Sequence, residues 1–79
     1  MKESVIFYTT AGCHLCDLAR AVYEGTLNPD YFNVETIDIA DSDQLIEQYG
    51  TRIPVIKRMS DGAELNWPFD AHKLMDFLS

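Results

Sequence analysis

The feature that most limits the possible folds is the apolar run at residues 4–9, which shows no alternation of polar and apolar side chains. A strand with this pattern is typical of the centre of a sheet that is covered on both faces. The chain has 79 residues, too few to divide its apolar side chains between two cores. We therefore expect one domain, residues 1–79, built around a central strand near its start.

The segment after this run predicts a turn and a helix. Residues 10–12 form the turn, and Gly25 is expected to end the helix as its C-terminal cap. Apolar residues recur at helical spacing and predict a single buried stripe, made of Leu15, Leu18, Ala19, Val22 and Tyr23. A strand followed directly by a helix is the beginning of an α/β arrangement.

The remaining segments predict three more strands and two more helices. Strands are expected at 33–39, 52–58 and 63–67, with a hairpin turn at 60–62 between the last two. A short helix follows a cap at Asp41 or Ser42 and ends at Gly50. Asp70 begins the last helix, with Phe69 and Leu74 spaced to form a hydrophobic staple. The order β-α-β-α-β-β-α predicts a four-stranded mixed sheet with three helices.

The net charge of −7 is placed unevenly along the chain. From Glu24 to Glu47 there are seven acids and no base. This stretch would repel phosphate groups, so the sequence argues against nucleic acids and anionic membranes as partners. Two interpretations stay open for the acids, a docking face for basic partners and an ordinary solvated surface.

The first apolar run is too short for a signal-peptide core or a membrane span. We therefore expect a cytoplasmic location, where structural disulfides are rare. Cys13 and Cys16, the only two cysteines, are separated by two residues. In that compartment a close cysteine pair points to redox chemistry or to metal binding more than to a structural crosslink.

The position of the pair favours redox chemistry. Cys13 should lie at the start of the first helix, where free backbone N–H groups and the helix dipole stabilise a thiolate. Such a helix end can lower the cysteine pKa from about 8.5 towards 7 or below, and the thiolate is the form that attacks a disulfide. Asp17, four positions after Cys13, would disfavour the thiolate, so the net shift of the pKa stays open. Cys16, one turn further on, can then resolve the mixed disulfide. His14, Thr10 and Gly12 surround the nucleophile and are the residues expected to tune its pKa.

Other interpretations of the pair remain open. A structural zinc site needs four ligands, and Cys13 and Cys16 supply two. His14 lies inside the motif and His72 is far along the chain, so we expect no metal site within one chain. An iron–sulfur cluster or copper ion shared between chains, and two inert buried thiols, are the alternatives.

Two segments resemble a known family. Residues 6–8, followed by Gly-Cys-His-Leu-Cys at 12–16, are similar to the first strand and active-site turn of glutaredoxins. Residues 52–55, Arg-Ile-Pro-Val, resemble the segment that thioredoxin-fold proteins place against their cysteines through a cis proline. The Cys-x-Leu-Cys motif and a late Trp-Pro-Phe stretch are similar to a subgroup of small bacterial glutaredoxin-like proteins.

The resemblance implies a thioredoxin-like fold and a thiol–disulfide oxidoreductase that serves cell redox homeostasis. Cys13 would be the nucleophile and Cys16 the resolving thiol. Pro54 would be cis, and the N–H and C=O of Ile53 would pair with an extended substrate. The alternatives are a metal or iron–sulfur carrier and a non-catalytic module that binds peptides in the groove at Ile53 and Pro54.

The resemblance also leaves the place of glutathione open. Glutaredoxins have a basic residue where this chain has Thr10, and a Gly-Gly turn where it has Trp67-Pro68. Asp70 could hold the glutathione amine, Arg52 its carboxylate, and Trp67 could form a wall of the substrate groove. We expect no bound cofactor, glutathione as a candidate co-substrate, a disulfide-containing protein or small thiol as partner, and a monomer.

Overall fold

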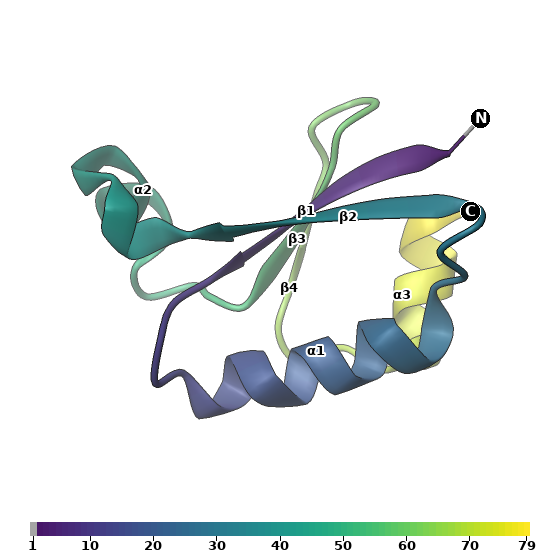
Figure 1. Cartoon of the computed structure of the whole chain (residues 1–79), viewed down its shortest axis with the longest axis horizontal. Coiled ribbons are helices and arrows are strands. Elements are labelled where there is room, and N and C mark those ends of the chain that lie inside the picture. Colours follow the sequence, from purple (N-terminus) through teal and green to yellow (C-terminus); the bar gives the residue numbers. More distant parts are fainter. Residues whose placement is uncertain (1) are drawn as a thin grey trace.

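The computed structural model describes residues 2–79 (Figure 1). Along the chain the elements are β1 (Glu3–Thr9), α1 (His14–Thr26), β2 (Phe32–Asp38), the 3-10 turn η1 (Ile39–Asp41), α2 (Asp43–Tyr49), β3 (Val55–Arg58), β4 (Glu64–Asn66) and α3 (Ala71–Leu78). The predicted order is confirmed, with η1 added between β2 and α2. Among the helices of residues 2–79, none has the length and apolarity needed to cross a bilayer.

The four strands form one mixed sheet in the order β2-β1-β3-β4. β1 pairs parallel to β2 and antiparallel to β3, and β3 pairs antiparallel to β4. β1 is central, and its last five residues are all buried. The unbroken apolar run therefore marks the middle strand, as its pattern predicted.

Helices cover both faces of the sheet. In Figure 1, α1 and α3 lie below the sheet and α2 lies at its left end. Val5 and Phe7 of β1 point into the cluster under α1 and α3, whereas Ile6 and Tyr8 point into the cluster under α2. This alternation is the reason that every residue from position 5 to 9 is apolar or buried: each face of β1 meets a core.

The predicted helix signals are confirmed at three of the four positions that carry them. Ser42 caps α2 by accepting the Leu45 N–H, Asp70 caps α3 by accepting the Lys73 N–H, and Gly50 ends α2. Gly25 is not a cap: α1 continues to Thr26 and ends at Leu27, which is buried in the core. Gly25 does not have the positive φ of Gly12 and Gly62, so its backbone does not interrupt the helix.

The buried stripe of α1 was predicted incorrectly in part. Leu15 and Leu18 are 46% and 44% exposed, and the buried residues of the helix are Cys16, Ala19 and Tyr23. The helix is turned so that Cys16 faces the sheet, which carries the Leu15 and Leu18 side away from the core. Sequence spacing defines two adjacent stripes and does not decide which one meets the sheet.

The third strand begins later than predicted. Residues 52–54 lie outside β3, because the N–H groups of Arg52 and Ile53 both donate to the C=O of Tyr49 and so close the end of α2. Pro54 has no N–H to offer a neighbouring strand. Val55 is therefore the first residue that pairs with β1.

Candidate functional site

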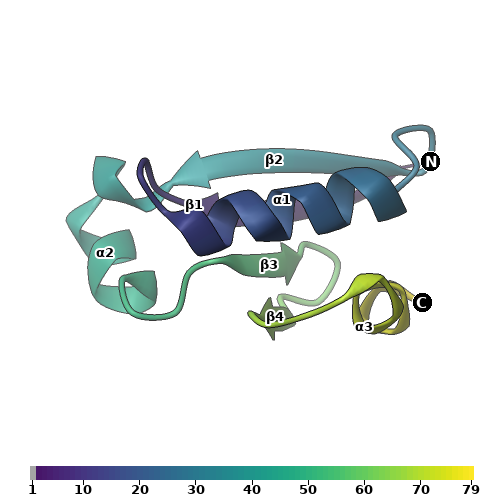
Figure 2. The same cartoon turned by 90° about the horizontal axis from the view of Figure 1, so that it is seen from below.

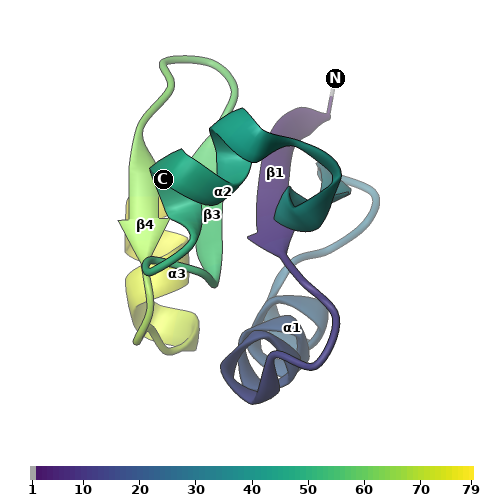
Figure 3. The same cartoon turned by 90° about the vertical axis from the view of Figure 1, so that its left-hand side faces the viewer.

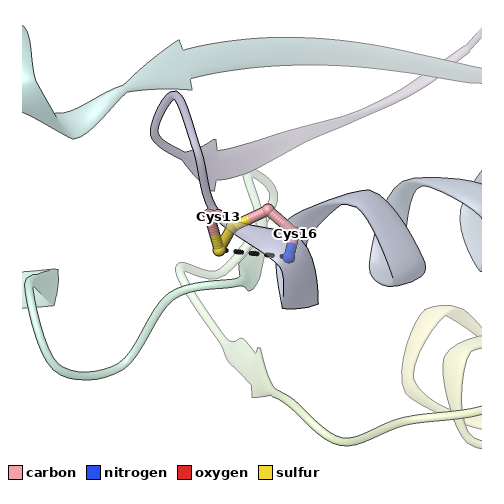
Figure 4. The surroundings of a disulfide bond; sticks show 2 residues. All are labelled: Cys13 and Cys16. Carbon is pink, nitrogen blue, oxygen red and sulfur yellow. Dashed lines mark hydrogen bonds between the residues drawn. A yellow bond between two sulfur atoms is a disulfide. The ribbon is translucent and has the colours of Figure 1, made fainter.

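The two cysteines lie where β1 passes into α1. Residues 10–12 make the connection, and Gly12 adopts a φ of 77°, which favours glycine. Cys13 is the N-cap of α1 and is half-buried, while Cys16 is 2% exposed. The two residues are joined by a disulfide with their Cα atoms 5.2 Å apart (Figure 4). The tight glycine turn and the cap together place the outer sulfur at the helix start.

A backbone donor points at the outer sulfur. The N–H of Cys16 donates to Sγ of Cys13 over 3.1 Å (Figure 4). The C=O of Cys13 accepts the N–H of Asp17 over 3.2 Å, which is the first bond of the helix. A sulfur in this position receives both a directed donor and the positive end of α1, and each favours its anionic form.

The neighbours expected to tune Cys13 lie around this turn. His14 is exposed at the first position of α1, and Thr10 is half-buried just after β1. No side-chain hydrogen bond joins either of them to Cys13 within residues 2–79. In the oxidised form their influence is therefore confined to local charge and shape.

The segment at Ile53 and Pro54 lies at the same end of the sheet as the disulfide. The last pair between β1 and β3 is Tyr8 with Val55. Pro54 therefore lies just beyond this pair, beside the last residue of β1 before the turn that leads to Cys13. Cys13 and Ile53 both pack against the core cluster that contains Cys16. The Ile53–Pro54 peptide bond is cis, and so is Trp67–Pro68.

The backbone N–H of Ile53 has a partner within the structure. The N–H of Ile53 already donates to the C=O of Tyr49 over 3.1 Å, so it is not free to pair with an extended substrate as the resemblance implied. This bond ends α2, and the same residue cannot serve both purposes without giving up the turn. Only the C=O of Ile53 is left for that contact.

Trp67 lies next to Pro54. Its backbone N–H donates to the C=O of Pro54 over 3.3 Å, and its ring packs edge-on against Phe69 with ring centroids 5.1 Å apart. The side chain is half-buried against the core cluster. The structure therefore brings Pro54 and Trp67 together, with the tryptophan in part exposed.

Arg52 and Asp70 already have partners. Arg52 forms an ion pair with Glu64 at 2.7 Å and a hydrogen bond to Asn66 at 3.1 Å, and its guanidinium lies 5.1 Å from the ring centroid of Tyr49. Asp70 is exposed and uses one carboxylate oxygen to cap α3. The Lys73 N–H at this cap lowers the pKa of Asp70 below its ordinary value.

Sequence reasoning missed the group that holds Arg52. Tyr49 donates its O–H to Glu64 over 2.5 Å and stacks on Tyr8 with ring centroids 4.2 Å apart. Glu64 has a lowered pKa, chiefly because it accepts from Arg52 and then because it accepts from Tyr49. Tyr49 and Glu64 are 15 positions apart in the chain, and no local motif joins them.

Metal binding would need ligands from elsewhere. Within residues 2–79, the His, Cys, Asp and Glu side chains form no group of three or more placed to hold a metal ion. A hollow of about 440 Å³ does lie in the structure, but it is at the other end of α1, among residues that include Tyr23, Leu27, Phe32 and Val34.

Comparison with known proteins gives the family. The sequence-family model described as "Glutaredoxin-like domain (DUF836)" matches residues 4–79. This chain belongs to the glutaredoxin-like domain family. Its fold is thioredoxin-like, and a glutaredoxin-like domain with a Cys13–Cys16 disulfide has the arrangement of a redox-type protein of that fold. A comparison with curated proteins finds no match.

Solved structures agree with this assignment. The glutaredoxin-like domain is 34% identical to the target protein XcR50 from X. campestris, whose X-ray structure superposes with a TM-score of 0.82 over 94% of this chain and 93% of that one. The solution structure of XcR50 superposes with a TM-score of 0.79 at the same identity, over 94% of this chain and 90% of that one. Protein Ne2328 from Nitrosomonas europaea is 25% identical, with a TM-score of 0.71 over 100% of this chain and 94% of that one.

Proposed function

We propose that this protein is a dithiol thiol–disulfide oxidoreductase in which Cys13 is the nucleophile and Cys16 the resolving thiol. The observation that carries the proposal is the position of Cys13 Sγ at the N-cap of α1, where it accepts the Cys16 N–H over 3.1 Å. After reduction, the same N–H and the positive end of α1 would stabilise a Cys13 thiolate. Half-burial leaves this sulfur open to a substrate, whereas Cys16 is shielded.

The reaction would begin with the reduced pair. The Cys13 thiolate attacks one sulfur of a substrate disulfide, a new S–S bond forms, and the other substrate sulfur leaves as a thiolate that takes a proton from water. Cys16, once deprotonated, attacks Cys13 Sγ. This step forms the Cys13–Cys16 disulfide and releases the second substrate thiol. An external thiol reductant then returns two electrons and two protons to the pair.

The substrate would lie between the disulfide and the Ile53–Pro54 segment. The C=O of Ile53 would accept from the substrate backbone, while Pro54 and Trp67 would form the wall behind it. Support comes from the Trp67 N–H bond to the C=O of Pro54, which holds these two residues together. The protein would act as a monomer, since each of these groups comes from one chain.

Glutathione is included in the proposal as a co-substrate that resets the pair. Arg52 would contact its carboxylate and Asp70 its amine. Arg52 would keep its bond to Glu64, and Asp70 would keep its cap on α3. Glutathione would therefore use the remaining donors and oxygens of these two side chains.

The pKa of Cys13 is the measurement that tests the proposal most directly. In Cys16→Ser, Cys13 is the only thiol, and its alkylation rate by iodoacetamide can be followed against pH. We expect a pKa clearly below the ordinary value of about 8.5 in the folded protein and a return to that value in urea. Cys13→Ser is the matched control, in which the remaining Cys16 should alkylate slowly because it is buried.

Turnover completes the test. With a protein disulfide as substrate, Cys13→Ser should lose reduction activity, and Cys16→Ser should accumulate a mixed disulfide that mass spectrometry detects. Equal activity in the wild type and in Cys13→Ser would end the redox proposal. Stoichiometric iron, copper or zinc in protein purified without oxygen, lost in Cys13→Ser, would support a metal carrier instead. Peptide binding that survives loss of both thiols would support a non-catalytic module.

A further inference from the structure

A group of carboxylates lies at the end that carries the disulfide. Asp38 pairs with Thr9 at the carboxyl ends of β2 and β1, where the chain turns towards Cys13. Further exposed acids follow in η1 and α2, and one lies in the first turn of α1: Asp41, Asp43, Glu47 and Asp17. Figure 3 looks onto this end and shows α2 together with the first turn of α1.

The basic side chains lie elsewhere or are paired. Arg58 stands opposite Val5, towards the far end of β1, and Lys57 stands opposite Ile6, in the middle of that strand. Lys2 precedes the far end. Arg20 is in the middle of α1, 5.9 Å from the ring centroid of Phe7. Lys73 is on α3, which lies beside the carboxyl-terminal half of α1 in Figures 1 and 2.

The basic residue at the disulfide end is Arg52, which donates a hydrogen bond to the Glu64 carboxylate over 2.7 Å. Its charge is therefore compensated within the structure. The acids around the disulfide have no comparable partners among the ion pairs of residues 2–79, which join Arg52 to Glu64, Arg58 to Asp61 and His72 to Asp76. The disulfide end is thus the negative end of the molecule.

Exposed apolar side chains follow Cys13 along α1. Leu15 stands between the two cysteines in the chain and is 46% exposed. Leu18, one turn further along α1, is 44% exposed, and Val22 continues the same side of the helix and is half-buried. Exposed leucines that adjoin each other next to a reactive group are typical of a contact surface.

The distance between the two groups of charges decides which of them acts on a partner at the disulfide. The molecule measures 32 × 23 × 17 Å, whereas charges at physiological salt are screened over about 8 Å. A partner at the disulfide therefore experiences the nearby acids more strongly than the distant bases. Local fields of this kind change association rates by about 10-fold to 1,000-fold.

We infer that the preferred substrate is a positively charged polypeptide with an apolar residue beside its disulfide, and that anionic small disulfides are disfavoured. This inference rests on the proposed oxidoreductase function and names the substrate class of the same site. The basic residues of the polypeptide meet the acids of α1, η1 and α2, and its apolar residue covers Leu15 and Leu18. The exchange itself is the step given above, and the external thiol reductant named there restores the pair.

The test uses the reduced protein and symmetrical peptide disulfides. The peptides have one length and one leucine beside the cysteine, and differ only in flanking Lys, Ser or Glu residues. The rate of oxidation of the Cys13–Cys16 pair is measured by acid quench and mass spectrometry. At low salt we expect the Lys peptide to react about 10-fold to 100-fold faster than the Glu peptide. At 1 M salt, where screening acts over about 3 Å, this ratio should fall to within about threefold.

Two triple variants with the same change in net charge locate the effect. Asp17→Asn, Asp43→Asn and Glu47→Gln together should remove most of the preference for the Lys peptide. Glu24→Gln, Asp30→Asn and Asp76→Asn, which change acids away from the disulfide, should keep it. A Lys-to-Glu ratio within about twofold in the wild type would overturn the inference, as would an equal loss in both triple variants. If no peptide oxidises the pair, the proposed function itself has failed.

The apolar part has its own variants. Leu15→Asn with Leu18→Asn should slow the reaction of the leucine-containing Lys peptide about 10-fold to 100-fold, because roughly half of a leucine side chain loses its contact at each position. The same pair should not slow a Lys peptide that has serine in place of leucine. Met75→Asn is the control, since this side chain is 43% exposed on α3. Equal slowing by Met75→Asn, or no slowing by the Leu15 and Leu18 pair, would overturn the apolar contact.

Discussion

Tyr49 offers the sharpest test of how the structure holds the segment beside the disulfide. The residue is 1% exposed, stacks on Tyr8, and donates its O–H to Glu64 over 2.5 Å. Tyr49→Phe removes this donor and leaves the ring, so packing is preserved. A hydrogen bond to a charged group contributes about 1.5–3 kcal/mol. Glu64 keeps its bond to Arg52 and its side chain is 23% exposed, so the lower end of that range applies.

We therefore expect Tyr49→Phe to lose about 1.5 kcal/mol of unfolding free energy at pH 7. For a domain of this size the melting temperature should fall by about 6–12 °C. Urea unfolding of the oxidised protein, followed by circular dichroism, measures the loss. Tyr31→Phe is the matched control, because it removes the same hydroxyl from a side chain that is 65% exposed.

The pH dependence adds a second check. The bonds from Arg52 and then from Tyr49 lower the pKa of Glu64, so their stabilisation is present above the unfolded pKa of about 4.3 and is lost as pH falls through the lower folded value. The difference between wild type and Tyr49→Phe should shrink over that acid range. A loss at pH 7 no larger than that of Tyr31→Phe, or a loss that is the same at every pH, would refute the reasoning.

Other predictions concern the caps, turns and ion pairs. Asp70→Ala should lower the unfolding free energy measured in urea by about 1 kcal/mol, because α3 loses its cap. Asp70→Asn should keep the cap and therefore the stability. Gly62→Ala should lower the unfolding free energy by about 1 kcal/mol, since Gly62 has a φ of 75°. Gly25→Ala should raise the unfolding free energy by about 0.5–1 kcal/mol in the same assay, because Gly25 is helical and has open space for a Cβ. Arg58→Ala should raise the pKa of Asp61 from about 2 towards its ordinary value, measured by NMR titration. Stability linked to Asp61 is present above pH about 4 and is lost as pH falls through its lowered pKa.

Much of the site was predictable from the sequence because its signals are local. The glycine before Cys13, the apolar run before that glycine and the helical pattern after it all lie within a few residues of one another. The cap at Asp70 and the staple of Phe69 with Leu74 are local in the same sense, and both staple residues are buried as expected. Short-range steric and hydrogen-bonding preferences decide these features, so neighbouring letters are enough.

Other features depend on how the chain turns and packs, and the sequence left them undetermined. The sequence did not show that the Ile53 N–H closes the end of α2, nor that Glu64 of β4 pairs with Arg52. The side of α1 that is buried was also outside the reach of the sequence. Leu15, Leu18 and Cys16 all satisfy helical spacing, and only the orientation of α1 on the sheet decides among them.

The sequence by itself determined the order of elements, the central strand and the position of Cys13 at the start of a helix, since each depends on contacts between near neighbours in the chain. The tertiary structure decided which donors remain open beside the disulfide and which leucines are exposed. It also decided that acids from α1, η1 and α2 share one end of the molecule. These features depend on strand register and helix orientation, which are set by packing between segments far apart in the chain.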